Sequence, residues 1–531
     1  MNIKMSDTKL PIGIQSFEKI RENNNLYVDK TELIYDLVHT DVPYFLSRPR
    51  RFGKSLLLST MKAYWEGKKE LFSGLRIEEL EAENDQAWEE YPVFYIDFNR
   101  DNYKSHNKLE EILDYHLSQW ESVYGKEDSE RSLAARFQYL LKTAFEKTRK
   151  RCIILIDEYD KPLLETMEDP ELVEHNKGVF KGFFSTLKSF DEYIRFAFIT
   201  GVTKFGKVSI FSDLNQLKDI SVNSKYATIC GITEDEMLEL FDKEIDKLAA
   251  SQDVTRDECL EELRKMYDGY HFHPVSAGVY NPFSLFNAFA DGEFGSYWFE
   301  TRSPDFLVRQ LRTNGFDVRK FTDRTLYASE SRLKDYTGNS MDPLPLLYQT
   351  GYLTIADYDK RRKRYTLAFP NDEVKYGFIE SLIPDYTPAV TAGNGLDIYT
   401  LDEYIENGNT AGIRSVLTGL FASIPYTKDN DPFENYFQAV IYLIFTLLGK
   451  YTLCEMHTFS GRIDCKVETD EIIYLFEFKR DDTAENALKQ IDDKEYSLPF
   501  SADRRKLFKI GVSFDSKTRT LVGWKEEEVK Q

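Results

Sequence analysis

Residues 44–65 read YFLSRPRRFGKSLLLSTMKAYW, and this stretch decides the fold of the first part of the chain. Its first four residues are mostly apolar and predict a short strand, and residues 56–65 have the pattern of a helix. The turn between them is rich in arginine and ends in Gly-Lys-Ser. Gly-Lys-Ser between a strand and a helix is typical of the P-loop, G-x-x-x-x-G-K-[ST], which binds phosphate groups.

Each residue type in this loop has a physical role. Gly53 lets the backbone approach a phosphate, Lys54 offers a charge to the β- and γ-phosphates, and Ser55 offers a hydroxyl to Mg²⁺. The helix N-terminus adds its dipole and its free N–H groups. The P-loop pattern has glycine where this chain has Arg48, so the motif alone leaves open a basic turn before a helix. We expect the nucleotide-binding residues to be Arg48, Pro49, Arg50, Arg51, Phe52, Gly53, Lys54, Ser55 and Leu56.

A second motif is the apolar run Cys152–Asp157, which ends in Asp157-Glu158. An acidic residue at the carboxyl end of a parallel strand lies where such sheets bind ligands. Asp157 could hold Mg²⁺ through water, and Glu158 could orient and deprotonate an attacking water. A strand followed by a polar turn is the alternative, and Pro162 fits it. The two motifs together predict nucleotide binding more specifically than either alone.

The first third of the chain alternates short apolar runs with long helical patterns, such as 109–124 and 133–150. This alternation is typical of βαβ units and predicts an α/β fold with a parallel sheet. The predicted strands are 44–47, 93–98, 153–157, 196–200 and a weaker one near 217–221.

Thr200 ends the apolar run 196–200 and is followed by glycine. A polar group at that strand end could lie beside the γ-phosphate as a sensor. Thr203 and Lys204 are alternatives for this role, and an ordinary Thr-Gly turn is equally compatible with the sequence.

The organisation of the chain changes at Thr233. Thr233 and Glu236 form a capping-box pattern before an apolar-periodic stretch, which predicts the start of a mostly helical region. Residues 386–397 are rich in Thr, Ala, Gly and Pro and predict a linker. The predicted division is a P-loop domain at 1–232, a helical lid or linker region at 233–395, and an α/β domain at 396–531.

Two basic runs stand out in an acidic chain. Residues 361–364 read RRKR between two apolar runs, 353–358 and 365–369, and predict the solvated turn of a hairpin. A contact to nucleic acid is the alternative. The same alternatives apply to residues 504–506, which read RRK.

The last hundred residues carry a third constellation. Glu477 and Lys479 are two positions apart on a predicted strand, so they share one face. There the carboxylate could hold a cation while the ammonium polarises the attacking water or the scissile phosphate. Asp464, on a neighbouring strand, could complete a Mg²⁺ site. The ordered features are a helix opened by Glu434, a strand at 451–457, G-R-I-D at 461–464, a strand at 472–479, and a helix with Gln490 and Tyr496.

Taken together, these motifs make the chain similar to a bacterial family in which an AAA-ATPase-like domain precedes a PD-(D/E)XK nuclease-superfamily domain. The matching stretches include RPRRFGKSLLL, IILIDEYDKPL, FITGVTKF, YDGYHF, GRIDCKV and YLFEFK. The form R-P-R-R-F-G-K-S is a hallmark of that family, so Arg48 no longer counts against a P-loop. The resemblance implies Walker A and Walker B roles for Lys54, Ser55, Asp157 and Glu158, and nuclease roles for Asp464, Glu477 and Lys479, supported by Glu434 and Gln490.

Composition excludes several classes of protein. The 531 residues are 42% hydrophobic and 14% aromatic, which is enough apolar surface for about three packed domains. The net charge of −21 excludes a general polyanion binder, so any nucleic-acid contact needs a local patch or a metal. Five scattered cysteines without a C-x-x-C pair favour a reducing compartment. The N-terminus does not resemble a signal peptide, and the longest apolar run, 439–448, is too short to cross a bilayer.

We therefore expect a soluble, cytoplasmic protein that does not bind membranes. It would bind ATP and Mg²⁺, hydrolyse ATP, and couple this to metal-dependent cleavage of nucleic acid, with Mn²⁺ as an alternative metal at the nuclease site. DNA and RNA are both open as substrates, and so is oligomerisation. The alternative is a nucleotide-regulated binding module whose nuclease-like domain docks a partner or nucleic acid without cleaving it.

Overall fold

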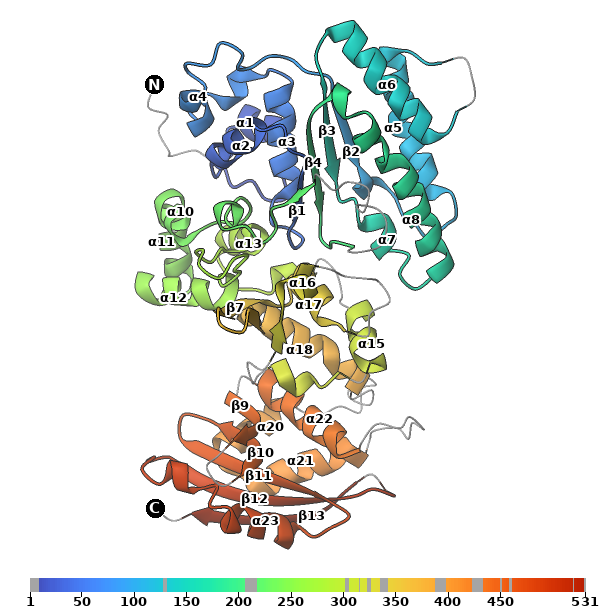
Figure 1. Ribbon diagram of the computed structural model, residues 1–531. Helices are drawn as coiled ribbons and strands as arrows, with labels where there is room; N and C mark the ends of the chain where they lie inside the picture. The colour runs from blue at the N-terminus through green and yellow to red at the C-terminus, as the bar shows by residue number, and fades with distance from the viewer. Residues whose placement is uncertain are drawn as a thin grey trace. The chain divides into compact units, whose positions relative to one another are not determined.

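The computed structural model describes residues 9–127, 131–205, 217–300, 305–314, 316–321, 326–334, 342–386, 398–422, 433–448, 451–457, 461–518 and 520–529. The chain divides into two compact units (Figure 1). The first contains residues 1–298 and 328–373, and the second contains 299–327 and 374–531. Most of the region predicted as a lid thus belongs to the first unit, while the three-domain division itself stays a prediction.

The first unit is built on a five-stranded parallel sheet in the order β2-β3-β4-β1-β5. Parallel strands end at the same edge of a sheet, so Ser47 lies beside Gly201 and Asp157 beside Asp97. Every residue of β3 is buried, which explains its unbroken apolar run. The five predicted strands are confirmed as β1 (Tyr44–Ser47), β2 (Val93–Asp97), β3 (Cys152–Asp157), β4 (Ile194–Gly201) and the short β5 (Lys218–Asp219).

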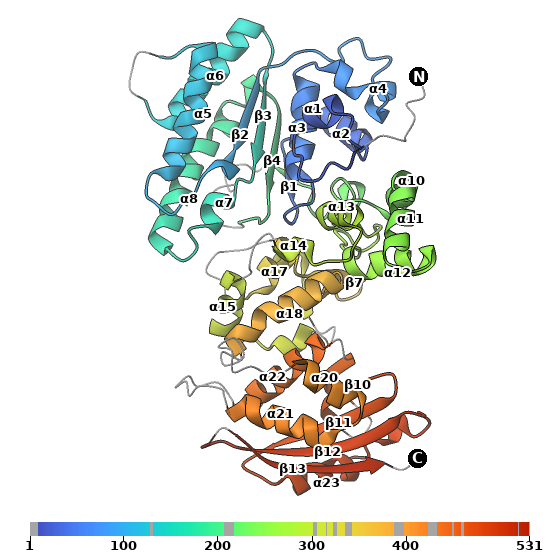
Figure 2. The same cartoon turned by 180° about the vertical axis from the view of Figure 1, so that it is seen from behind.

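Helices cover both faces of this sheet. Helices α1, α2 and α3 lie on one side, and α5, α6 and α8 lie on the other (Figure 1, Figure 2). The helical patterns predicted after the P-loop motif and at 109–124 and 133–150 are confirmed. The helices are α1 (Phe17–Glu22), α2 (Thr31–Val38), α3 (Lys54–Trp65), α4 (Arg76–Leu80), α5 (Lys108–Tyr124), α6 (Leu133–Thr148), α7 (Lys161–Leu164), α8 (Pro170–Phe184) and α9 (Thr186–Ser189).

The rest of the first unit is mainly helical. The predicted capping box is confirmed, because Thr233 accepts the backbone N–H of Glu236 while Glu236 accepts that of Thr233. The predicted hairpin around the RRKR run is also confirmed, with β7 antiparallel to β8. The elements are α10 (Glu234–Leu240), α11 (Asp242–Ser251), α12 (Arg256–Tyr267), α13 (Pro282–Asp291), α16 (Glu330–Lys334), α17 (Leu344–Thr350), β7 (Thr354–Asp359) and β8 (Arg364–Ala368), while α14 (Tyr297–Glu300) and α18 (Asp372–Tyr386) each begin in the first unit and end in the second.

A buried carboxyl group joins three of these segments. Glu373, at the start of α18, is 1% exposed. It accepts hydrogen bonds from the Ser284 hydroxyl at 3.0 and 2.8 Å and from the backbone N–H of Trp298 at 2.7 Å. Burial raises the pKa of Glu373 to about 7, and the two hydrogen-bond donors oppose that shift.

We expect this raised pKa to make the stability of the first unit fall with rising pH. The folded protein holds the proton up to about pH 7, whereas the unfolded chain releases it near its ordinary pKa of about 4.5. The stabilisation is therefore complete below the unfolded pKa and is lost as pH rises through about 7, by up to about 3 kcal/mol. The variant Glu373→Gln should lack this pH-dependent loss of stability. Its melting temperature, relative to that of the wild type, should therefore rise between pH 5 and pH 8. Exposed Glu239→Gln is the control, and parallel pH profiles for the wild type and Glu373→Gln would contradict the prediction.

The second unit contains a mixed sheet in the order β13-β12-β11-β10-β9. Strands β11 and β12 are parallel, and the other neighbours are antiparallel. The predicted strands at 451–457 and 472–479 are confirmed. The strands are β9 (Tyr451–His457), β10 (Arg462–Glu468), β11 (Ile472–Arg480), β12 (Lys506–Asp515) and β13 (Thr520–Val529).

Helices again cover both faces. Phe476 of β11 packs against Phe445 of α22, with ring centroids 5.8 Å apart. Its neighbour Leu475 points to the other face and packs in a cluster with Ile491 of α23. Both halves of the chain are thus α/β, as predicted. The helices are α15 (Asp305–Thr313), α20 (Ile398–Glu406), α21 (Thr410–Ala422), α22 (Phe433–Leu447) and α23 (Ala484–Asp493), and the short strand β6 is Leu326–Ala328.

The predicted extent of the last helix is wrong at its C-terminal end. Helix α23 ends at Asp493, so Gln490 lies on it but Tyr496 does not. Tyr496 instead follows a turn in which Glu495 has a φ of 49°, and its hydroxyl accepts the backbone N–H of Arg462 at 3.1 Å. Among the described residues, no helix has the length and apolar character that a bilayer span needs.

Candidate functional site

The phosphate-loop motif lies between β1 and α3, at the carboxyl edge of the parallel sheet. Gly53 adopts a φ of 92° at the N-cap of α3, a conformation that favours glycine. A Cβ atom there would meet nothing within 4 Å. Ser55 follows in the first turn of the helix and is half-buried. The loop therefore brings a helix N-terminus to an open space at the edge of the sheet.

The Lys54 ammonium group lies inside the loop. It donates to the backbone carbonyls of Arg48 at 2.9 Å and Pro49 at 3.0 Å, and the residue is 4% exposed. Burial raises the pKa of Glu158, while the charge of Lys54 opposes this rise. The charge of Arg50 opposes it as well, so both cations influence the Glu158 carboxylate.

The structure brings Asp157 and Thr200 together at the carboxyl edge of the parallel sheet. Asp157 is 2% exposed, and its Oδ1 accepts the Thr200 hydroxyl at 2.6 Å. The two alternatives for Thr200 are engaged elsewhere: the Thr203 hydroxyl donates to Asp160 at 2.8 Å, and Lys204 pairs with Asp219 at 2.8 Å. Thr200 is thus the polar group that links the middle strand of the sheet to the acidic strand end.

Sequence reasoning missed Asp160. Its carboxylate accepts the backbone N–H groups of Val202 at 3.1 Å and Thr203 at 2.6 Å, and it fixes the segment after β4 against the segment after β3. Gly201 is required there, because a Cβ would lie 2.6 Å from the Asp160 carboxylate. The only signal in the sequence is the second aspartate of D-E-Y-D.

The structure gives the Arg48 side chain a role other than nucleotide contact. Arg48 is 1% exposed, and its guanidinium donates to the carbonyls of Ser47 at 2.9 Å, Ser221 at 2.8 Å and Tyr226 at 2.9 Å. The same group lies 4.0 Å from the centroid of the Phe272 ring. Burial lowers the pKa of Arg48. The arginine at the first position of the motif therefore anchors the loop to distant segments, and only its backbone faces the loop interior.

Residues from later segments of the chain also contact Arg50, Arg51 and Phe52. The Arg51 guanidinium stacks on Phe283 at 4.5 Å, and the indole N–H of Trp298 donates to the Arg50 carbonyl at 3.3 Å. Phe52 is buried against Tyr270, with ring centroids 4.7 Å apart. Sequence reasoning did not assign these supporting residues, although Y-D-G-Y-H-F is a visible aromatic motif.

We expect Arg48→Ala to destabilise the protein far more than Arg51→Ala. Removing the Arg48 guanidinium leaves three backbone carbonyls without a charged donor, at a cost on the order of 3 kcal/mol. Arg51 is exposed, and its single cation–π contact contributes about 0.5–1 kcal/mol. Chemical denaturation of the two variants measures the difference. Equal losses would contradict a structural role for Arg48.

A pocket opens beside the phosphate loop. The hollow measures about 550 Å³ when its space open to solvent is included, and the loop residues Phe52 and Gly53 and the helix residue Leu56 line one wall. Tyr27 and Val28 from the N-terminal segment line another wall. Burial raises the pKa of Tyr27. The pocket is largely apolar and adjoins the N-terminus of α3.

The second unit brings four predicted residues together on the α23 side of the sheet. The Lys479 ammonium donates to Gln490 at 2.6 Å and lies 3.5 Å from Glu477. The Gln490 amide donates to the same Glu477 carboxylate. Asp464 accepts the backbone N–H of Phe478 at 2.8 Å, and the β10–β11 register, continued by one step, places Asp464 opposite Glu477.

The geometry of Glu477 fits a metal ligand. Glu477 is 1% exposed, and its Oε2 atom is buried without a hydrogen-bond partner in the described part of the chain. Burial, followed by the charge of Asp464, raises the pKa of Glu477 to about 8. A buried carboxylate oxygen without a donor, facing a second carboxylate, is the environment that a divalent cation would stabilise.

One of the predicted residues of this site has a side chain that the structure does not describe. Glu434 lies in the first turn of α22, and its side chain falls outside the described residues. No group of three or more His, Cys, Asp or Glu side chains with metal-binding geometry occurs among the residues that the structure describes. Of the predicted carboxylates in this unit, the structure describes the side chains of Asp464 and Glu477.

Two family models match the chain. Residues 11–211 match a family described as predicted AAA-ATPase, and residues 432–524 match the PD-(D/E)XK nuclease superfamily. The chain is also similar to an uncharacterized protein in the vnfD 5′ region of Azotobacter chroococcum mcd 1. The two are 36% identical over 548 residues, which cover 99% of this chain and 100% of that protein. The matched regions contain both constellations described above.

Proposed function

The chain belongs to the family that joins an AAA-ATPase-like domain to a C-terminal PD-(D/E)XK nuclease-superfamily domain, and from this premise we propose an ATPase coupled to a metal-dependent nuclease. These domains indicate an ATPase and nuclease-like function in general terms. The observation that carries the more specific proposal is the Glu477 carboxylate, which is buried beside Asp464 and Lys479 and has one oxygen without a hydrogen-bond donor among the described residues.

On the ATPase side, the free N–H groups at the start of α3 and the Lys54 ammonium would hold the phosphates. Ser55 and Asp157 would bind Mg²⁺, and Glu158 would orient and deprotonate the attacking water. Thr200 supports this arrangement, because its hydroxyl is already hydrogen-bonded to Asp157. Binding of ATP would draw Lys54 from the Arg48 and Pro49 carbonyls toward the phosphates.

The pocket beside Gly53 is suited to the nucleoside part of ATP. Its lining is mostly apolar, and Tyr27 offers an aromatic surface against which a base could pack. Leu56 would lie at the side of the pocket nearest the helix.

On the nuclease side, Asp464 and Glu477 would hold the divalent metal, which would polarise the scissile phosphate and its attacking water. Lys479 would stabilise the charge that develops on the phosphate. Gln490 contacts both Glu477 and Lys479 and would keep them in place. Glu434 remains a further candidate ligand from α22.

The test is a cleavage assay in which the full chain is incubated with labelled single- and double-stranded DNA and RNA. Each substrate is tested with Mg²⁺ or Mn²⁺, and with or without ATP. Metal-dependent cleavage whose rate changes with ATP is the expected result, and the substrate that disappears identifies the nucleic acid. Binding and hydrolysis of ATP without cleavage of any substrate would leave a nucleotide-regulated binding module.

A further inference from the structure

The tip of the β7–β8 hairpin is the most basic stretch of this acidic chain. Five successive residues, Lys360 to Arg364, carry positive charges in a protein with a net charge of −21. Lys360, Arg361, Arg362 and Lys363 are all exposed. Arg362 pairs with Asp359 at 3.1 Å, and its side chain is still 66% exposed. In the described part of the chain, Lys360, Arg361 and Lys363 make no ion pair, so most of the charge at the tip faces solvent.

Hydrogen bonds and ring packing fix the conformation of the turn at the tip of the hairpin. The Asp359 carboxylate accepts the backbone N–H groups of Arg361 at 3.0 Å and Arg362 at 2.9 Å. Tyr358 and Tyr365 pack across the base of the turn, with ring centroids 4.7 Å apart. Lys363 has a φ of 50°, a conformation that asparagine or glycine adopts more easily. The fold thus holds like charges together at some cost in stability.

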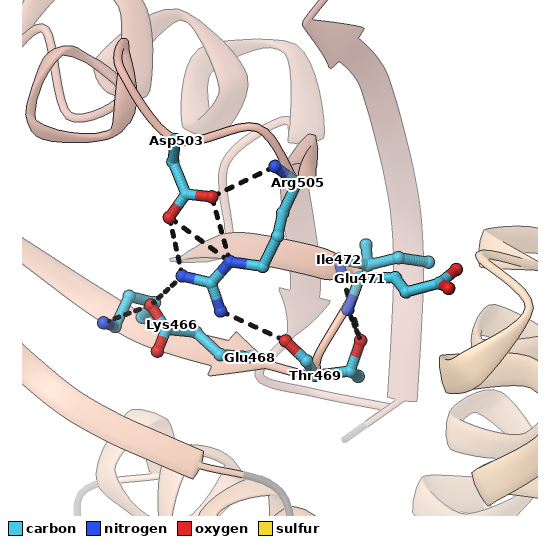
Figure 3. Close-up of polar contacts among 7 residues, drawn as sticks. All are labelled: Lys466, Glu468, Thr469, Glu471, Ile472, Asp503 and Arg505. Atoms are coloured by element: carbon cyan, nitrogen blue, oxygen red, sulfur yellow. Dashed lines mark hydrogen bonds and ion pairs between the residues drawn. The ribbon is translucent and has the colours of Figure 1, made fainter.

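The runs at 504–506 and in the phosphate loop expose fewer cations than the tip does: Arg504 and Lys506 in the first run, and Arg51 in the second. In the run at 504–506, Arg505 donates to both oxygens of Asp503 and to the Thr469 carbonyl at 3.1 Å, and it lies 3.6 Å from Glu468 (Figure 3). This network lowers the pKa of Asp503 to about 2, with the Arg505 hydrogen bond as the main cause. In the phosphate loop, Arg48 is buried and Arg51 is stacked on an aromatic ring.

We propose that the tip of the β7–β8 hairpin contacts the phosphate backbone of nucleic acid, as a binding surface of the first unit separate from the nuclease site. The inference rests on the proposed function, because it extends the nucleic-acid contact beyond the second unit. A nucleic-acid backbone is a dense line of negative charge, and contacts to it release counterions in proportion to the number of phosphates neutralised. The acidic surface elsewhere repels such a ligand, so an exposed cluster of cations also orients it.

The test measures binding of labelled DNA and RNA, single- and double-stranded, by fluorescence anisotropy across a salt series, with EDTA present to prevent cleavage. The tip variant carries Arg361→Gln, Arg362→Gln and Lys363→Asn, and asparagine suits the positive φ at position 363. The control variant carries Lys243→Gln, Lys247→Gln and Lys265→Gln, three exposed lysines of the same unit, and it changes the net charge equally.

The tip variant should bind duplex DNA on the order of a hundredfold more weakly near 0.1 M salt, and its slope of log K against log salt should be shallower by about 2–3. The control variant should match the wild type. Equal slopes for the tip variant and the wild type would overturn the inference, and the cleavage assay would then still test the proposed function separately. Absence of both binding and cleavage in the wild type would overturn the inference together with the nuclease half of the proposal.

Discussion

Replacing Lys479 by alanine is expected to slow nucleic-acid cleavage by about 10²–10³-fold and to leave ATP hydrolysis unchanged. The ammonium group lies 3.5 Å from Glu477 and 2.6 Å from Gln490, next to the carboxylates that would hold the metal. A positioned charge that stabilises developing negative charge contributes a factor of this size. Initial cleavage rates under single-turnover conditions, with saturating Mg²⁺, measure the loss of the chemical step.

Lys489→Ala is the matched control. Lys489 is exposed on α23, one residue before Gln490, so its removal deletes the same single positive charge without changing the side chain of Lys479 on β11. It should cleave at the wild-type rate. Cleavage at the wild-type rate by the Lys479→Ala protein would contradict the assignment of Lys479 to the nuclease site. Loss of cleavage in both variants would point to the fold of α23 instead.

Replacing Lys54 by alanine is expected to lower the rate of ATP hydrolysis by about 10²–10³-fold, because its ammonium group lies inside the phosphate loop, where it would stabilise charge on the phosphates. Steady-state phosphate release measures this loss, and binding of a fluorescent ATP analogue separates loss of affinity from loss of catalysis. If ATP gates the nuclease, the response of cleavage to ATP should disappear in the same variant.

The control for this variant is Lys62→Ala, on the outer face of the same helix. Lys62 lies 3.5 Å from Glu66 and is 42% exposed, so its removal tests the charge and fold of α3 without touching the loop. Melting curves of both variants are needed, because Lys54 also satisfies two loop carbonyls in the absence of nucleotide. A folded Lys54→Ala protein that hydrolyses ATP at the wild-type rate would refute the assignment.

Much of the fold could be predicted because its signals are local. Strands β1 and β9 have the bounds that their apolar runs predict, and the capping box at Thr233 requires only two residues three positions apart. The closeness of Asp157 and Thr200 follows from strand topology, since parallel strands end at one edge. The predicted pairing of strands around Asp464 and Glu477 is confirmed as well, because the short connection between β10 and β11 allows an antiparallel hairpin.

Other features could not be predicted because their causes lie far away in the sequence. Arg48 looks like a phosphate ligand locally, but Ser221, Tyr226 and Phe272 decide where its side chain goes. Tyr496 continues a plausible helical pattern, yet its contact with the backbone of Arg462 favours a turn. Tertiary contacts of this kind override local propensity.

The support of the phosphate loop also sets an order of events during synthesis of the chain. The loop is complete at Gly53, but the residues that support it come up to about 300 residues later. They are Phe272, whose ring packs against Arg48, Trp298, whose indole bonds to the Arg50 carbonyl, and Gly351, where a Cβ would lie 2.6 Å from Pro49. At about 5–20 residues per second, a ribosome needs roughly 15–60 s to make that interval. During synthesis the loop therefore lacks these contacts until the later residues have been made. A fragment that ends at the predicted boundary, residue 232, would lack them permanently.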